Sequence, residues 1–305
     1  MSPSAVPVEV DGRMLKLSNL DKVLYPEAGL TKGEVINYYT SVAPVLLPHL
    51  ADRPLTVKRY PNGVDGPFFF EKNASKSKPE WVRTALLPAP GSTKNRDEID
   101  YVVVDDLPTL VWLANLAALE LHTPQWRVGR RGKVHGADQL VLDLDPGPPA
   151  TVVECCRVAL LLRERLAADG LTPVAKTSGS KGLQVYAAVA ETPAEKTSGY
   201  ARRLAQRLEE EHADLVVSRM TKALRPRKVL VDWSQNNAAK TTVSVYSLRA
   251  RPAPTVSTPV TWDEVEAGAG GQPLAFTYAD VLERMADGDL FAALLEAGPR
   301  PRVPD

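Results

Sequence analysis

The sequence predicts an α/β protein in which a central sheet is flanked by helices. Three observations support this prediction. Capping signals mark the starts of several helices, and short runs rich in β-branched residues alternate with those helices along the middle of the chain. The composition, 44% hydrophobic and 24% charged over 305 residues, is that of a globular protein large enough to bury a substantial core.

Four helices are expected to begin at a threonine that has a glutamate three residues later, because these two side chains can satisfy each other's backbone groups. The predicted helices run from Thr31 to about Leu47, from Thr151 to Asp169, from Thr192 to about His212, and over a short segment after Thr261. A further helix is expected over residues 107–121, which are apolar on nearly every side and therefore buried.

Seven strands are expected where short β-rich runs occur, at residues 55–59, 101–104, 140–145, 173–177, 184–189, 228–231 and 242–246. Residues 253–273 are rich in proline and glycine, which indicates a linker. We therefore expect a main domain over residues 1–252, followed by the linker and a small helical tail, residues 253–305, that packs on the same domain.

Several classes of protein are excluded. No apolar run reaches the roughly 18 residues that a membrane span needs, and the N-terminal segment has no signal-peptide pattern. The two cysteines, Cys155 and Cys156, are neighbours on a predicted helix, where they are badly placed to bond with each other. We expect a soluble protein of a reducing cytoplasm, without a disulfide scaffold or a zinc site.

Basic and acidic residues balance at 37 each, but their distribution along the chain is uneven. From residue 250 onward the acidic residues outnumber the basic ones by nine to four, so the part before it is positive. Residues 125–136 and 219–228 are basic segments without any acid. Such segments form either solvated surface or, beside a cluster of carboxylates, a site for phosphate groups.

The carboxylates Asp143 and Asp145 stand out in the segment LVLDLDPG. On a strand they share one face, and Pro146 and Gly147 end the strand beside them. Two like charges this close favour a divalent cation, although capping of the next helix is the alternative. Asp232 ends another apolar strand after a basic segment, so the three acids together indicate two-metal phosphoryl transfer.

The segment TSGSKGL, residues 177–183, lies between two predicted strands. Its glycines permit a tight turn, and its hydroxyls and Lys181 suit a triphosphate. Small polar residues are also what any hairpin turn uses, and no Walker A spacing is present.

Taken in order, LDLDPG, TSGSKGL and RxxxVLVDWSQN resemble the three catalytic motifs of the archaeo-eukaryotic primase superfamily. More specifically, they resemble the polymerase domain of bacterial DNA ligase D, the end-joining enzyme that works with Ku. The resemblance extends over about residues 17–252 and includes LSNLDKVLYP, TKGEVINYY, KRYPNGVDGPFFFEK, ALELHTPQW and KTTVSVYSLRARP. It implies mixed, largely antiparallel central sheets flanked by helices, with an RRM-like primase-polymerase core.

The resemblance also implies roles for individual residues. The two divalent metal ions, manganese preferred and magnesium accepted, are expected on Asp143, Asp145 and Asp232. The incoming nucleotide is expected on His122, Ser178, Lys181, Gln184 and Arg225. The downstream 5′-phosphate of DNA is expected within a part spanning about residues 15–135, on Asn19, Lys22 and Lys32. The template strand is expected on Phe69, Phe70, Arg59 and Arg249.

Two of these assignments carry a further argument from the residues. Lys32 falls in the first turn after the Thr31 cap, where free N–H groups and the helix dipole favour an anion. Gln184 departs from the pattern, because the family usually has histidine there; glutamine still donates a hydrogen bond but carries no charge. For Phe69 and Phe70, a core strand is an equal alternative to stacking on bases.

The implied function is template-directed nucleotidyl transfer that fills gaps and extends ends at DNA double-strand breaks, with ribonucleotides preferred. We expect a monomer of the bacterial nucleoid that acts on 5′-phosphorylated DNA with NTPs or dNTPs, with Ku and a separate ATP-dependent ligase as partners. No KxDG motif is present, which indicates a stand-alone polymerase. The alternatives are de novo primer synthesis, a haloacid-dehalogenase-like phosphatase, and a DNA-end binding module without activity.

Overall fold

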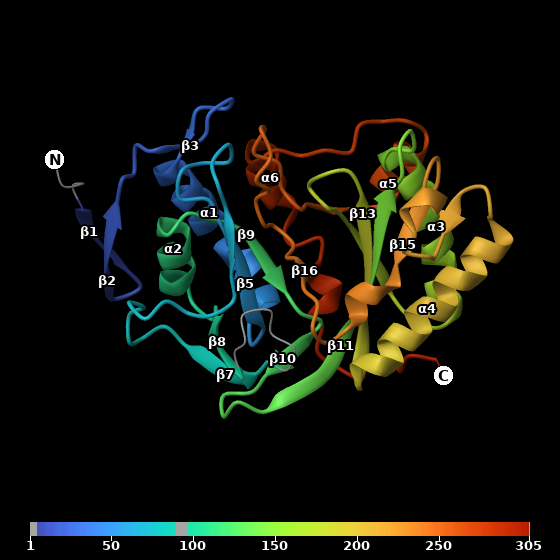
Figure 1. Ribbon diagram of the computed structural model, residues 1–305, viewed down its shortest axis with the longest axis horizontal. Helices are drawn as coiled ribbons and strands as arrows, with labels where there is room; N and C mark the ends of the chain where they lie inside the picture. Colours follow the sequence, from blue (N-terminus) through green and yellow to red (C-terminus); the bar gives the residue numbers. More distant parts are fainter. Residues whose placement is uncertain (1–4, 90–96, 305) are drawn as a thin grey trace.

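The computed structural model describes residues 5–89 and 97–304, and two sheets lie side by side in it (Figure 1). The first sheet has six strands in the order β16-β9-β5-β8-β7, with β6 paired to β5. These strands are β5 (Pro54–Arg59), β6 (Phe69–Glu71), β7 (Thr84–Pro88), β8 (Glu98–Val103), β9 (Ala118–Thr123) and β16 (Thr242–Val243). All of their pairings are antiparallel.

The second sheet has seven strands in the order β14-β15-β11-β13-β12-β17, with β10 paired to β11. Its strands are β10 (Trp126–Val128), β11 (Val134–Pro146), β12 (Pro173–Thr177), β13 (Leu183–Thr192), β14 (Val216–Val217), β15 (Val229–Asp232) and β17 (Pro259–Val260). Only β14 and β15 run parallel among these pairings. The expected mixed, largely antiparallel sheets are confirmed.

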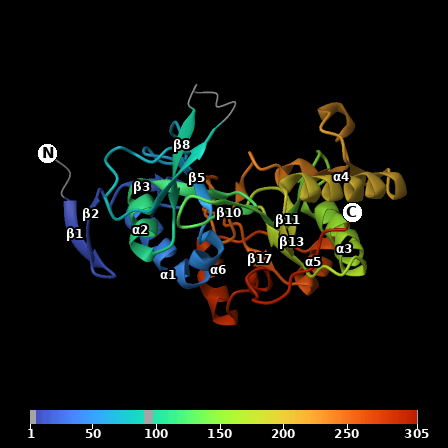
Figure 2. The same cartoon turned by 90° about the horizontal axis from the view of Figure 1, so that it is seen from below.

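Helices cover the outer sides of the two sheets, as both views show (Figures 1 and 2). Near the first sheet lie α1 (Lys32–Leu50) and α2 (Leu107–Asn115), and near the second lie α3 (Val152–Ala168), α4 (Ala194–Glu211) and α5 (Trp262–Ala269). The short helix α6 is Tyr278–Arg284, and the 3₁₀ turns η1 to η4 are Lys222–Leu224, Trp233–Asn236, Met285–Asp287 and Ala292–Leu294. Two hairpins complete the fold, β1 (Ala5–Val10) with β2 (Arg13–Ser18) and β3 (Val23–Tyr25) with β4 (Leu30–Thr31).

Strand β11 shows how the core sets the position of the carboxylates. Leu140, Leu142 and Leu144 are fully buried in the core that α3 and α4 form with the second sheet. Because side chains alternate along a strand, Asp143 and Asp145 point to the opposite face. That face is turned toward the first sheet, whose own core includes Val141 of β11.

The predicted helix over residues 107–121 is wrong in its second half. Helix α2 ends at Asn115, whose amide side chain bonds to the backbone of Ser18 and Lys16 on β2. Ala117 then adopts a positive φ of 57°, which reverses the chain into strand β9. Apolar composition alone did not separate a buried helix from the buried strand that follows it.

The helix predicted from Thr192 also begins differently. Helix α4 starts at Ala194 with Pro193 as its N-cap residue and no capping side chain, because Thr192 still pairs with Ala137 at the end of β13. The capping boxes at Thr31, Thr151 and Thr261 are confirmed. Residues 253–273, predicted as a linker, contain β17, which pairs with β12, and α5, which packs on α3. Among the residues that the structure describes, no helix is both long and apolar enough to span a membrane.

Candidate active site

The three aspartates predicted to bind metal lie on one face of the second sheet. In the β11–β15 pairing Asp143 is directly opposite Asp232, and Asp145 is opposite Leu230. Side chains of directly opposite residues point to the same face, and so do those two apart on one strand. Asp143, Asp145 and Asp232 therefore converge at the exit of β11, although 87 residues separate the second from the third.

Polar neighbours hold two of these carboxylates. Asp143 Oδ1 accepts a hydrogen bond from Gln184 Nε2 at 3.0 Å. Asp232 Oδ1 accepts from the backbone N–H and hydroxyl of Ser234, at 2.9 and 2.5 Å, and its Oδ2 accepts from Gln235 Nε2 at 2.7 Å. Asp145 is exposed. The 3₁₀ turn η2 that follows β15 thus orients Asp232.

The electrostatics of this face favour a cation. Burial, followed by the nearby charges of Asp145 and Asp232, raises the pKa of Asp143 to about 7. Burial and Asp232 also raise the pKa of Asp145. Carboxylates that repel one another in this way gain most from a shared divalent ion.

The donor set fits such ions, because carboxylate oxygens suit magnesium and manganese. Within residues 5–89 and 97–304, however, no three acidic, histidine or cysteine side chains are already gathered as a closed ligand set. Both carboxylate oxygens of Asp232 accept hydrogen bonds from residues of the η2 turn. Because each carboxylate oxygen has two lone pairs, these hydrogen bonds leave lone pairs of Asp143 and Asp232 for an ion.

The TSGSKGL segment forms the turn between β12 and β13, beside the carboxylates. A Cβ on Gly182 would lie 2.0 Å from the carbonyl oxygen of Leu144, so only glycine allows this approach to β11. Ser178 Oγ accepts from the N–H groups of Ser180 and Gly182 at 3.2 and 3.1 Å. Lys181 is exposed at the tip of the turn. The turn that carries Ser178 and Lys181 is thus packed against the end of β11 that carries Asp143 and Asp145.

Arg249 connects this turn to the first sheet. Its Nη1 donates to the carbonyl oxygen of Ser178 at 2.6 Å, and its Nε lies 3.4 Å from Glu120 Oε1. Glu120 is buried on β9, and its Oε2 lies 3.0 Å from His122 Nε2 and 3.8 Å from Lys58 Nζ. Burial alone would raise the pKa of Glu120, but the His122 bond and the charges of Arg249, His122 and Lys58 hold it at about 2.

This cluster places His122 and Arg249 together, on the side of the first sheet next to the turn. Burial lowers the pKa of His122, while Glu120 opposes that effect. The sequence prediction missed Glu120 and Lys58. The alternation in ALELHT was a usable signal, since it places Glu120 and His122 on one face of a strand.

Arg225 lies on the other side of the carboxylates. Its positive charge lowers the pKa of Asp145, against the larger effect of burial. Its Nη2 donates to the Met220 carbonyl oxygen at 2.7 Å, and its buried Nε has no partner among the described residues. An unpaired guanidinium N–H next to an acidic face suits the oxygen of a bound anion.

The three phenylalanines of residues 68–70 are exposed, so the alternative of a core strand is wrong for them. Phe70 pairs with Lys58 on β5, and its ring lies 6.2 Å from that of His122. Phe69 faces the other way, under the guanidinium of Arg59. Arg59 itself is engaged with Glu71 at 2.7 Å and with the Leu116 carbonyl oxygen at 2.9 Å.

The predicted phosphate site at the N-terminal part differs from expectation in one respect. The backbone N–H groups of Lys32 and Gly33 donate to the carbonyl oxygens of Lys22 and Leu20, at 2.8 Å each, so these helix N–H groups are not free for an anion. The expectation that free N–H groups beside Lys32 bind an anion is therefore wrong.

The side chains named for that site nevertheless lie near one another. Lys22 is exposed and donates to Asn62 Oδ1 at 2.9 Å, whereas the buried Lys32 Nζ donates to the Asn115 carbonyl oxygen at 2.9 Å. Burial and the charge of Lys22 lower the pKa of Lys32. Asn19 is exposed with a positive φ of 53°, which directs the chain toward Lys22.

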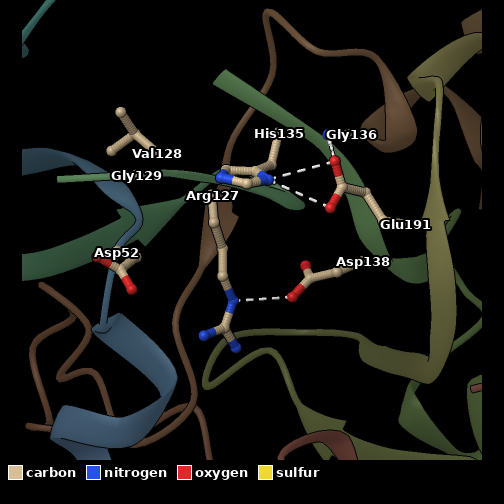
Figure 3. Close-up of a pocket in the computed structure, with 8 residues that line it drawn as sticks. All are labelled: Asp52, Arg127, Val128, Gly129, His135, Gly136, Asp138 and Glu191. Atoms are coloured by element: carbon tan, nitrogen blue, oxygen red, sulfur yellow. Dashed lines mark hydrogen bonds and ion pairs between the residues drawn. The ribbon is translucent and has the colours of Figure 1, made fainter. Parts of the chain in front are cut away.

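A cavity of about 150 Å³ lies elsewhere, near the start of β11 (Figure 3). Four of its lining side chains pair with one another, Arg127 with Asp138 at 2.8 Å and His135 with Glu191 at 3.2 Å, whereas Asp52 pairs with Arg83 outside the cavity. Asp138 precedes Asp143 by five residues on β11, or roughly 17 Å along an extended strand. This cavity is therefore separate from the carboxylate face.

Two largely antiparallel sheets, an Asp-x-Asp on β11 paired with an Asp on β15, and a glycine-serine-lysine turn are typical of a nucleotidyltransferase of the primase-polymerase class. The family model described as "LigD, primase-polymerase domain" matches residues 31–291. Multifunctional non-homologous end joining DNA repair protein LigD of Mycobacterium tuberculosis is 45% identical over 285 residues, which cover 91% of this chain and 36% of the relative. The bifunctional LigD of Bacillus subtilis is 30% identical over 273 residues, covering 89% of the chain and 42% of the relative.

A solved structure is also similar. The polymerase domain from Mycobacterium tuberculosis Ligase D in complex with DNA has a TM-score of 0.87 and 43% identity, covering 93% of this chain and 99% of that one. The chain belongs to the LigD primase-polymerase domain family, which makes it a DNA-directed nucleotidyltransferase. It spans about 36% of the length of its mycobacterial relatives.

Proposed function

We propose that this protein fills gaps and extends ends at DNA double-strand breaks, as the polymerase of a non-homologous end-joining reaction. The observation that carries the proposal is the pairing of Asp143 with Asp232, with Asp145 on the same face. The LigD names of the relatives support the repair role, and the DNA-bound structural neighbour supports DNA as the substrate. We expect Ku and a separate ATP-dependent ligase as partners of a monomeric, nucleoid-associated enzyme.

Asp143, Asp145 and Asp232 hold two divalent ions in this proposal, manganese in preference to magnesium. When bound, such ions activate the attacking 3′-hydroxyl and stabilise charge on the leaving pyrophosphate. The protein's own groups position the nucleotide: Ser178 and Lys181 from the turn, Arg225 beside Asp145, and His122 from β9. Arg225 Nε, buried without a partner among the described residues, is the donor best prepared for a triphosphate oxygen.

DNA is held on both sides of the carboxylates in the proposal. Phe69 and Phe70, which are exposed, and Arg59 and Arg249 contact the template. Asn19, Lys22 and Lys32 hold the 5′-phosphate across the gap. Exposed aromatic rings stack on bases irrespective of sequence, and lysine provides a point charge for the phosphate.

The test is incorporation into a duplex with a one-nucleotide gap that carries a 5′-phosphate. We expect incorporation with Mn²⁺, less with Mg²⁺, and more from NTPs than from dNTPs. Absence of incorporation with either metal would contradict the proposal. De novo synthesis on single-stranded template, measured in the same assay without a primer, decides whether primer synthesis is a second activity.

A further inference from the structure

A row of four side chains crosses the second sheet at the level of the metal-binding face. The pairings place Lys176 of β12 opposite Gln184 of β13, Gln184 opposite Asp143 of β11, and Asp143 opposite Asp232 of β15. Lys176 is only 1% exposed, and Gln184 is buried beside it. No role is predicted from the sequence for Lys176, whereas Gln184 is predicted to bind the nucleotide.

The charged side chain of Lys176 is the donor in each of its hydrogen bonds. Its Nζ contacts the Val243 carbonyl oxygen at 3.1 Å, Ser257 Oγ at 2.6 Å and Gln184 Oε1 at 2.5 Å. A carbonyl oxygen only accepts, and Ser257 already donates its hydroxyl hydrogen to Thr177. In its charged form Lys176 is therefore the donor to both, and its third N–H points at Gln184.

This arrangement determines how the Gln184 amide is oriented. Its oxygen faces the lysine, so its NH₂ group faces Asp143 Oδ1 at 3.0 Å. The flipped amide would place NH₂ against an N–H donor and oxygen against a carboxylate, two repulsive contacts. Both ends of the Gln184 side chain are thus engaged inside the protein, and because only 3% of the residue is exposed, its second amide N–H has little access to a bound triphosphate.

We propose that Lys176 and Gln184 are positioning residues for the metal ligand Asp143, and that Gln184 does not bind the nucleotide. Lys176 orients Gln184, and Gln184 fixes Asp143 through Oδ1, so that Oδ2, which receives no hydrogen bond from a described residue, faces the site. The inference rests on the proposed function, since it concerns a residue of the proposed metal site. Groups that hold a metal ligand in this way typically change metal affinity by about 10- to 100-fold.

The test separates metal binding from nucleotide binding. Mn²⁺ alone is titrated into the metal-free full chain by calorimetry, and the KM for the NTP is then measured on the gapped duplex at saturating Mn²⁺. For Gln184→Met we expect Mn²⁺ affinity to fall by about tenfold with the NTP KM unchanged. Unchanged Mn²⁺ affinity with a raised NTP KM would overturn the inference and return Gln184 to the nucleotide site.

Three further variants sharpen the result. Gln184→His should restore Mn²⁺ affinity, because one imidazole nitrogen can accept from Lys176 while the other donates to Asp143. Lys176→Met should weaken Mn²⁺ binding, and combining it with Gln184→Met should weaken it no further than Gln184→Met alone. Gln139→Met, which removes a buried glutamine of β11 outside the row, is the matched control and should bind Mn²⁺ like the wild type.

The outcomes distinguish this inference from the proposed function. Incorporation by the wild type tests the function and does not depend on any variant. If the wild type incorporates nucleotides and all variants bind Mn²⁺ equally well, only the roles of Lys176 and Gln184 are wrong. Gln184→Met and Gln184→His carry the test if Lys176→Met does not fold.

Discussion

Asp143 on β11 and Asp232 on β15 are direct cross-strand neighbours, and this pairing joins two sequence motifs into one acidic face. Placing these carboxylates together is unfavourable for their charged forms. Burial and the neighbouring carboxylates raise the pKa of Asp143 to about 7. Between an ordinary carboxyl pKa near 4 and this value, the metal-free folded state binds more protons than the unfolded chain. Its stability therefore falls as the pH rises through this range.

The first prediction follows from this loss of stability with rising pH. Asp143→Asn removes the titrating carboxyl group, so the free energy of unfolding of the variant, relative to that of the wild type, should increase from about pH 5 to about pH 8. The measurement is urea unfolding in the presence of a chelator. If the difference in free energy of unfolding stays constant across this pH range, burial and the neighbouring carboxylates do not raise the pKa of Asp143.

Glu120 anchors the basic cluster of Arg249, His122 and Lys58. Glu120→Gln removes the buried negative charge that these three groups face and should lower the free energy of unfolding by about 3 kcal/mol at neutral pH. Thermal or urea unfolding measures it. The exposed pair Arg165–Glu211 gives a control, since Glu211→Gln should cost less than about 1 kcal/mol. Equal effects of the two variants would contradict the anchoring role.

Substitutions of Lys22 and Lys32 should differ in their effects on the stability of the fold. Both Lys22→Ala and Lys32→Ala should reduce the preference for a 5′-phosphorylated gap while primer extension without a gap continues. Only Lys32→Ala should also destabilise the fold, by about 1 to 3 kcal/mol, because the Asn115 carbonyl oxygen loses its donor. The checks are gap filling with and without the phosphate, and unfolding. Lys16→Ala on β2 is the control, and a loss of all extension would argue against a phosphate role.

Phe70 is 53% exposed, so its substitution should affect DNA binding and leave stability intact. Stacking on a base is worth about 1 to 3 kcal/mol, so Phe70→Ala should weaken binding of gapped DNA by roughly tenfold or more. Fluorescence anisotropy with labelled duplex measures it. Leu86→Ala, an exposed apolar residue of β7, should bind DNA normally. Normal binding by Phe70→Ala would remove this residue from the template surface.

The sequence predicted most of the elements because their signals are local. Three capping boxes and the strand of residues 173–177 appear as expected. The alternation LVLDLD correctly placed Asp143 and Asp145 on one face. The failures came from contacts distant in sequence: Asn115 ends α2 by bonding to β2, and Thr192 remains in β13 through its partner Ala137.

The same limit applies to the candidate active site. The sequence shows which residues carry charge, but strand register decides which of them lie close together. Lys176 gave no signal, because a lysine in a short apolar strand is not distinguishable from a surface residue until its three acceptors are known. At the N-terminus of α1 the sequence instead predicted a site that is not free. The backbone N–H groups expected to bind an anion donate to the carbonyl oxygens of Lys22 and Leu20.

The number of manganese ions bound per chain, measured by electron paramagnetic resonance with a non-hydrolysable NTP present, tests the proposed metal site most directly. We expect two ions for the wild type, and the loss of at least one in Asp143→Asn and in Asp232→Asn. If Asp232→Asn binds Mn²⁺ with wild-type number and affinity, Asp232 is not part of the metal site and the proposed two-metal site is wrong.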